Sequence, residues 1–92
     1  MEHLSIKEIS DRLLQIPGWE MHDNCIEKTF SFDNFKQAME FVNKVAEEAE
    51  RNRHHPDITI NYNKVTLSLT THDASGITHD DFKLARIIEQ LI

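Results

Sequence analysis

Apolar residues recur at helical spacing near both ends of the chain. At the start, Ser5 and Glu8 have the spacing of a capping box, and Pro17-Gly18 stops the periodic pattern behind them. Near the end, Thr78 and Asp81 have the same spacing, although Asp is a weaker partner than Glu or Gln. The apolar positions are Ile6, Ile9, Leu13 and Ile16 in the first stretch and Leu84, Ala85, Ile88 and Leu91 in the last. Both patterns predict amphipathic helices.

The clearest helical pattern lies in the middle of the chain and extends over four turns. We expect Asp33 to cap its start. The apolar stripe consists of Phe35, Ala38, Met39, Val42, Val45, Ala46 and Ala49. Phe41 lies off this stripe, and two interpretations of it are open. It is either a partly buried flank of the core or a contact in an oligomer.

Two regions between the helices change to the period of two that is typical of strands. The expected strands are residues 19–22, 25–32, 58–62 and 65–71, with turns at Asp23-Asn24 and Asn63-Lys64. Each pair of strands is joined by a short turn, which predicts two β-hairpins.

The predicted order is therefore helix–strand–strand–helix–strand–strand–helix. Because hairpins need no crossover helix, we expect an α+β fold, a four-stranded antiparallel sheet built from two hairpins with three helices packed on one face. With 92 residues, the chain is long enough for one domain, 1–92. A domain of this size buries roughly 60–65% of its unfolded surface, so its stability is modest and oligomerisation would add to it.

Charge and cysteine content narrow the classes of function. The net charge of −6, from 16 acidic and 10 basic residues, disfavours direct binding to nucleic acid. The single cysteine, Cys25, excludes an internal disulfide and fits a reducing compartment. No apolar run approaches the ~20 residues that cross a bilayer, and the N-terminus lacks a signal-peptide pattern. We therefore expect a cytoplasmic protein without membrane contact.

Three histidines converge in the predicted fold. His54 and His55 precede Pro56, which disfavours helical geometry at His55 and places the pair in a stiffened turn. His72 ends the second hairpin and shares the parity of the polar positions, which puts it on the polar face of the sheet. In the second hairpin, the start of strand 58–62 lies beside the end of strand 65–71. The three imidazoles are therefore expected at one edge of the sheet.

Imidazole suits proton transfer near neutral pH, because its unperturbed pKa is about 6.5. The histidine cluster therefore predicts acid–base chemistry, with ordinary structural histidines as the simpler interpretation. Three histidines could also hold zinc, but H-E-x-x-H and paired-cysteine spacing are absent, so we expect no metal. The remaining histidines, His3, His22 and His79, are expected on the surface.

The residues around these histidines resemble the signature of the pterin-4a-carbinolamine dehydratases. The matching segments are Glu50-Arg51-Asn52-Arg53-His54-His55-Pro56-Asp57, Tyr62-Asn63-Lys64-Val65, Leu69-Thr70-Thr71-His72, Gly76-Ile77-Thr78 and Asp81. Gly18-Trp19 and the helix that begins near Phe35 also fall where the family has similar features. The resemblance covers almost the whole chain.

The resemblance implies dehydration of a 4a-hydroxy-tetrahydropterin to the quinonoid dihydropterin, which recycles the cofactor of aromatic amino acid hydroxylases. By position, His54 and His72 would be the catalytic acid–base pair. His55 would bind and orient the pterin, with Glu50 and Asp81 in the polar surround and Trp19 nearby. The chemistry requires neither a metal nor another cofactor.

Simpler roles stay open for three of these residues. Asp81 also fits a helix cap, Glu50 a charge at a helix end, and Trp19 a core residue. Arg53 departs from the family pattern, in which a small, acidic or amide residue commonly precedes the histidine pair, and its bulk could alter the rim of the pocket.

The resemblance also implies an alternative function, protein binding, and association of this chain with copies of itself. Relatives with this fold act as binding proteins, either as a dimerisation cofactor for a transcription factor or as assembly factors. Family members form homodimers or homotetramers, and the sequence does not choose between the two.

Overall fold

The computed structural model describes residues 2–92, and Met1, the first residue of the expected domain, lies outside the described part. The elements in chain order are α1 (Ile6–Leu13), β1 (Glu20–His22), β2 (Cys25–Ser31), α2 (Phe35–Asn52), β3 (Asp57–Asn61), β4 (Lys64–Leu69), the 3₁₀ turn η1 (His72–Ala74) and α3 (His79–Glu89). This order confirms the expected α+β class.

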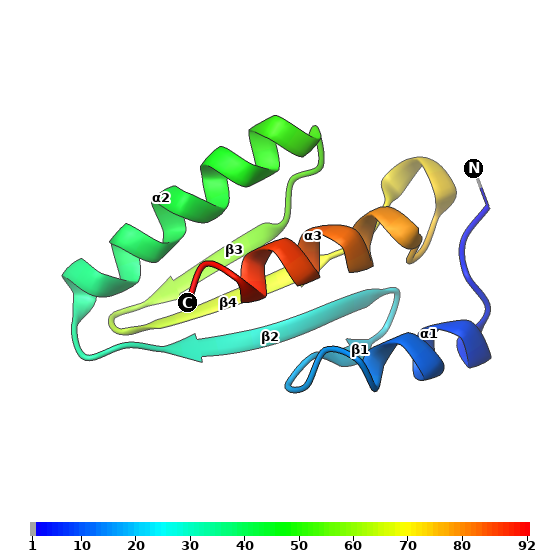
Figure 1. Cartoon of the computed structure of the whole chain (residues 1–92), viewed down its shortest axis with the longest axis horizontal. Helices are drawn as coiled ribbons and strands as arrows, with labels where there is room; N and C mark the ends of the chain where they lie inside the picture. The colour runs from blue at the N-terminus through cyan, green and yellow to red at the C-terminus, as the bar shows by residue number, and fades with distance from the viewer. Residues whose placement is uncertain (1) are drawn as a thin grey trace.

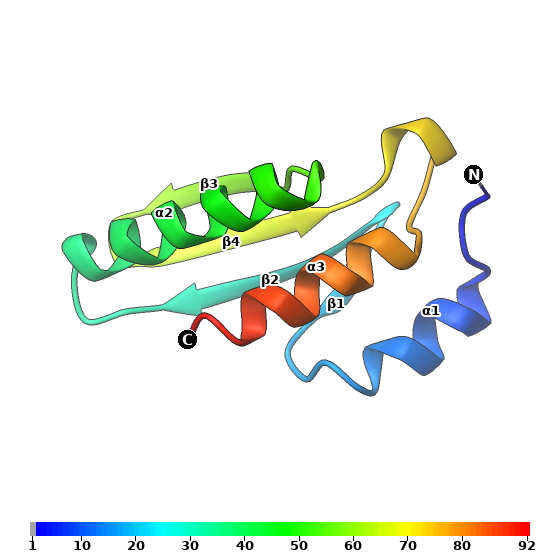
Figure 2. The ribbon, with the colours of Figure 1, turned by 45° about the horizontal axis from the view of Figure 1, so that its top comes forward.

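The four strands form one antiparallel sheet in the order β1-β2-β4-β3. The two hairpins meet through β2 and β4, which pair over six residues from Ile26 opposite Leu69 to Ser31 opposite Lys64. The three helices lie on the same side of this sheet (Figures 1 and 2). Helix α2 lies above β3 and β4, and α3 lies beside α2. Strands β1 and β3 are the edges, and the expected oligomer stays a prediction.

Both capping boxes that the sequence predicts are present. Ser5 and Glu8 bond reciprocally at the start of α1, and Thr78 and Asp81 do so at the start of α3. The backbone N–H of Ser5 is the main cause of a lowered pKa at Glu8. These caps satisfy backbone N–H groups that have no partner inside the helix, and they fix where each helix begins.

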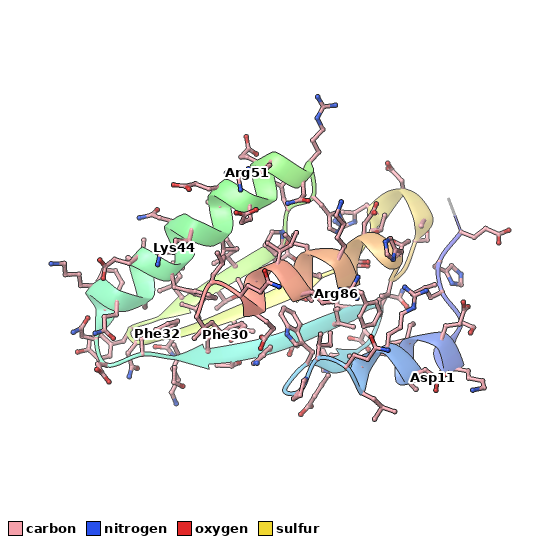
Figure 3. All side chains as sticks on the ribbon, viewed as in Figure 1. Asp11, Phe30, Phe32, Lys44, Arg51 and Arg86 are labelled. Atoms are coloured by element: carbon pink, nitrogen blue, oxygen red, sulfur yellow. The ribbon has the colours of Figure 1, made fainter. Side chains whose placement is uncertain are left out.

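The core lies between the sheet and the helices, and Phe41 belongs to it. Its ring packs against Phe30 and Phe32, with centroid distances of 4.9 Å and 5.0 Å, and it is only 4% exposed. Figure 3 shows Phe30 and Phe32 on the sheet side of α2, whereas Lys44 and Arg51 lie on its outer side. Phe41 is therefore a full core residue, more buried than in either interpretation of the sequence.

The structure corrects other details of α2. Phe35 and Ala46, expected in the apolar stripe, are exposed. The N-cap is Asn34, whose side chain accepts a hydrogen bond from the N–H of Gln37 at 2.8 Å, so the expected Asp33 cap is wrong by one residue. The buried face of α2 is thus rotated towards Phe41, relative to the stripe that the sequence predicts, because this face packs on the sheet.

Two other boundaries differ from the sequence prediction. Helix α1 ends at Leu13, before the Pro17-Gly18 stop, although Ile16 is still buried. The second hairpin turns at Tyr62 and Asn63, because Asn61 pairs with Lys64. Tyr62 is consequently exposed in the turn with a φ of 55°. Within residues 2–92, no helix is both long and apolar enough to cross a membrane.

Candidate functional site

The end of α2 places His54. The N–H of His54 donates to the carbonyl of Ala49 at 3.0 Å, and the N–H of Arg53 donates to the carbonyl of Glu50 at 3.3 Å. Together they form a Schellman motif, with Arg53 in the left-handed conformation at φ 52°. This motif ends the helix, and His54 and His55 lie outside it, as Pro56 predicts. The backbone of His54 is therefore fixed between the end of α2 and the start of β3.

The side chain of His54 is fixed by a buried carboxylate. Its Nε2 contacts Oδ1 of Asp81 at 2.5 Å. The side chain of Asp81 is completely buried and that of His54 is 15% exposed. The second oxygen, Oδ2, accepts from the N–H of Thr78 at 2.8 Å and from the hydroxyl of Thr71 at 2.9 Å. Asp81 thus caps α3, as one interpretation of this residue has it, and also holds His54, while its expected place in the substrate site stays a prediction.

This contact determines which imidazole nitrogen is available. An ionised carboxylate only accepts hydrogen bonds, so with Asp81 as the partner we assign the proton to Nε2 of His54. The other nitrogen, Nδ1, is then a base in the neutral ring and an acid in the protonated ring. Such a histidine can either take up or deliver a proton.

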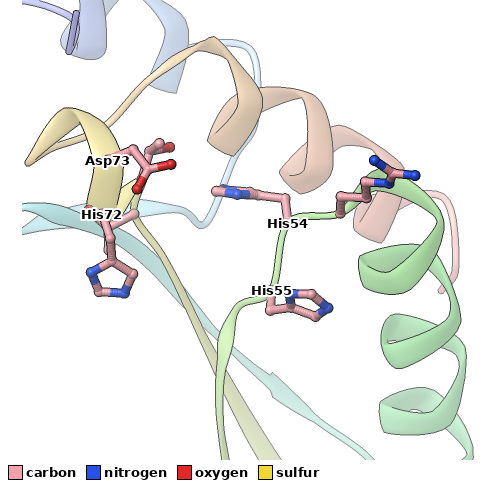
Figure 4. A pocket seen from close by; sticks show the side chains of 7 residues that line it. His54, His55, His72 and Asp73 are labelled. Atoms are coloured by element: carbon pink, nitrogen blue, oxygen red, sulfur yellow. The ribbon is translucent and has the colours of Figure 1, made fainter. Parts of the chain in front are cut away.

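His55 is held by a different carboxylate and turns the other way. Its Nε2 is hydrogen-bonded to Oε2 of Glu50. Both side chains are largely exposed, at 62% for His55 and 77% for Glu50. In Figure 4 the His55 ring turns towards α2, whereas the His54 ring extends towards the turn that carries His72 and Asp73. The two adjacent histidines therefore present their rings in different directions.

The third histidine follows the end of β4. The strand ends at Leu69, two residues earlier than expected, and His72 begins the 3₁₀ turn η1. The backbones of Thr71 and Gly76 form a bridge that closes this turn. His72 is therefore not at the end of a strand on the polar face, as the alternation predicts, but on a short turn in front of α3. The pairing of β4 ends early on both sides, because its last partners are Asp57 of β3, opposite Ser68, and Ile26 of β2, opposite Leu69.

These segments enclose a cleft of about 250 Å³. It is lined by Arg53, His54, His55, Thr70, Thr71, His72 and Asp73. Figure 4 shows that His54 and His55 reach it from the α2–β3 connection and His72 from the opposite side. A second cleft of about 310 Å³ shares Thr70, Thr71 and His72 with the first. The structure thus brings together the three imidazoles that the sequence places at one edge.

The other predicted site residues do not line the cleft themselves. Asp81 bonds His54 and Glu50 bonds His55, so both carboxylates lie one side chain away from it. Trp19 does not line the cleft. It is 4% exposed, and its indole N–H donates to Oε2 of Glu89 at 3.1 Å. Its expected part in substrate binding stays a prediction, and the contacts describe a core residue.

Sequence reasoning missed Thr71, which bonds Asp81 from within the fold. A signal was present, because Thr71 has the same parity as Val65, Leu67 and Leu69, the apolar positions of β4. A polar residue at a core-facing position needs a buried partner.

For metal ligation, among residues 2–92 no three His, Cys, Asp or Glu side chains are grouped so that they could hold an ion.

Arg53→Gly is expected to raise the free energy of unfolding by about 0.5–1 kcal/mol. For a residue with a Cβ, the left-handed conformation costs roughly 1–2 kcal/mol of stability, and glycine avoids this cost. Part of the gain is offset because glycine loses more conformational entropy than arginine when the chain folds. Urea unfolding measures the change. Arg53→Ala is the matched control, because it removes the guanidinium but keeps the Cβ. An equal gain from alanine would show that the charge, and not the backbone, is responsible.

Known proteins resemble this chain in sequence over almost its whole length. The family described as "Pterin 4 alpha carbinolamine dehydratase" matches residues 2–91. A protein from Thermomicrobium roseum is 53% identical over 91 residues, which cover 99% of this chain and 98% of the relative. One from Sulfurisphaera tokodaii is 50% identical over 92 residues, which cover 100% and 99%. Both have been named, provisionally, as pterin-4-alpha-carbinolamine dehydratases.

Solved structures agree with the sequence relatives. A crystal structure described as a transcriptional coactivator/pterin dehydratase from Brucella melitensis superposes with a TM-score of 0.94 at 33% identity and covers 98% of both chains. A pterin dehydratase-like protein described as a RuBisCO assembly factor has a TM-score of 0.65 at 19% identity, covers 79% of this chain and 84% of its own, and shares the fold alone. On the full-length sequence match, the chain belongs to the pterin-4-alpha-carbinolamine dehydratase family.

Proposed function

We propose that this protein, acting as one domain, dehydrates 4a-hydroxy-tetrahydropterins to quinonoid dihydropterins. The observation that carries this proposal is the cleft with three imidazoles, of which two are held by carboxylates. An ordinary surface histidine needs no buried carboxylate behind it. The family match supports a pterin as the molecule that enters the cleft.

The reaction needs two proton transfers and no change in oxidation state. The C4a–O bond breaks, and the oxygen leaves as water after it receives a proton from an imidazolium. The proton on N5 passes to a neutral imidazole as the C4a=N5 double bond forms. His54 and His72 lie on opposite sides of the cleft and would divide these two tasks, so no other cofactor is proposed.

The remaining residues would bind and orient. His55, held by Glu50 near the mouth of the cleft, would contact polar atoms of the pterin ring. Asp81 would keep the His54 ring in one tautomer and one orientation, as the carboxylate of a catalytic triad does for its histidine. The pterin would be the cofactor that aromatic amino acid hydroxylases consume, so the reaction would return it to use.

A binding role is the second candidate function. The Brucella melitensis relative is described as a coactivator as well as a dehydratase, and a protein with the same fold is described as a RuBisCO assembly factor. A scaffold does not need three imidazoles around one cleft, which favours the enzyme. The two roles can also coexist on different surfaces of the chain.

Rapid-mixing absorbance spectroscopy tests the proposal directly. Freshly formed 4a-hydroxy-tetrahydropterin should lose water faster with the protein than without it, and a metal chelator should not change the catalysed rate. His22→Ala, which alters an exposed histidine outside the cleft, should keep the full rate. If the folded protein produces no acceleration, the enzyme proposal fails and the binding role takes its place.

A further inference from the structure

Thr71 lies where the two halves of the histidine site meet. Its side chain contacts the carboxylate that holds His54, and its backbone directly precedes His72. The residue is partly buried. It reaches both Thr78 and Asp81, which cap α3. No other side chain that lines the cleft, among residues 2–92, bonds to both capping residues.

The hydrogen bonds around Thr71 run in one direction. Oδ2 of Asp81 only accepts, so the hydroxyl of Thr71 donates its single proton to it, at 2.9 Å. The oxygen of Thr71 lies 2.8 Å from that of Thr78, and Thr78 must therefore donate in that contact. The N–H of Asp80 donates in turn to the Thr78 oxygen at 3.2 Å. The order is thus Thr78 to Thr71 to Asp81.

This order commits the two oxygens of Asp81 to different partners. Oδ2 is occupied by the hydroxyl of Thr71 and the backbone N–H of Thr78, which leaves Oδ1 for Nε2 of His54. A carboxylate held by two donors on one oxygen cannot rotate without losing both of them. Thr71 therefore restricts the orientation of Asp81 and, through it, the ring of His54.

The backbone of Thr71 makes the second connection. Its N–H donates to the carbonyl of Gly76 at 3.0 Å, and the N–H of Gly76 returns a bond at 3.3 Å. These bonds close the turn that begins with His72. A displacement of Thr71 would consequently move both His54, through Asp81, and His72, through the chain.

We propose that Thr71 is a positioning residue whose hydroxyl fixes the tautomer and orientation of His54 through Asp81, and so aligns His54 with His72. The effect on turnover rests on the dehydratase function proposed above, whereas the effect on His54 does not. Thr71 itself contacts no reacting atom in this proposal.

The test compares Thr71→Val, which loses the hydroxyl at nearly constant volume, with Thr71→Ser, which keeps it. Thr66→Val is the matched control, because the hydroxyl of Thr66 bonds that of Thr29 on the opposite face of the sheet at 2.8 Å. Long-range ¹H–¹⁵N NMR of the imidazoles reports the tautomer of His54, and stopped-flow assays give kcat and KM.

We expect Thr71→Val to convert His54 from a single Nε2-protonated tautomer into a mixture. Its kcat should fall about tenfold, roughly what one hydrogen bond to a charged group contributes, while KM changes little. Thr71→Ser should restore both readouts, and Thr66→Val should change neither. If Thr71→Val does not fold, Thr71→Ala replaces it with the same two readouts.

An unchanged His54 tautomer in a folded variant that lacks the Thr71 hydroxyl would overturn the proposal. So would a loss of kcat that Thr71→Ser fails to restore. If the wild type has no dehydratase activity, the NMR result alone decides on Thr71, and only the proposed function fails.

Discussion

Replacing His54 or His72 by alanine is expected to slow catalysed dehydration by roughly 10²- to 10⁴-fold, the usual contribution of a positioned general acid or base. Each imidazole would serve one of the two proton transfers. Without either one, that transfer would have to go to or from water instead. Because the two steps belong to one reaction, the double variant should be only slightly slower than the slower single variant.

Stability should respond quite differently from rate in these two variants. His72 is exposed, so its replacement should change the free energy of unfolding by less than about 0.5 kcal/mol. His54 donates to buried Asp81, and its loss should cost about 1–3 kcal/mol. Stopped-flow rates and urea unfolding separate the two effects, with His22→Ala as the control. A rate that falls only as far as the folded fraction falls would contradict the catalytic assignment.

Asp81→Ala is expected to give the largest loss of stability, about 3 kcal/mol, because a buried acceptor with three partners disappears. The N–H of Thr78, the hydroxyl of Thr71 and Nε2 of His54 would all lose their acceptor. The capping box of α3 would also be lost. For a domain of this size, a loss of 3 kcal/mol corresponds to a fall in melting temperature of roughly 12–24 °C.

Asp80→Ala is the matched control for this prediction. Asp80 is the neighbouring acid in the first turn of α3, is partly exposed, and accepts none of these three bonds. Its loss should cost only the helix-dipole interaction, about 0.3–1 kcal/mol. Thermal unfolding followed by circular dichroism measures both variants. Equal losses would show that the buried network around Asp81 adds nothing beyond its charge at the helix end.

Local rules in the sequence predicted much of this protein. The two capping boxes, the long central helix and the two hairpins depend on residues within one or two turns of each other, so spacing alone reveals them. The turn at His54-His55-Pro56 also follows from a local restriction, that of proline on the residue before it. The convergence of the histidines followed from hairpin connectivity and needed no knowledge of packing.

Some predicted boundaries differ from the structure because neighbouring residues compete for the same role. Asp33 and Asn34 are both good caps, and only the geometry of the chain entering α2 selects Asn34. Phe41 was ambiguous for a similar reason. The direction of a helix's apolar face depends on the surface below it, and the rings of Phe30 and Phe32 lie under Phe41.

By itself, the sequence determined the elements, their order and the three histidines that line the cleft, because those features depend on short-range geometry and on residue chemistry. Only the tertiary structure decided that β2 pairs with β4, that Asp81 holds His54, and that the hydroxyl of Thr71 bonds Asp81. His54 and Asp81 are 27 residues apart in the chain. Contacts over such separations depend on how whole elements pack, and no local pattern encodes them.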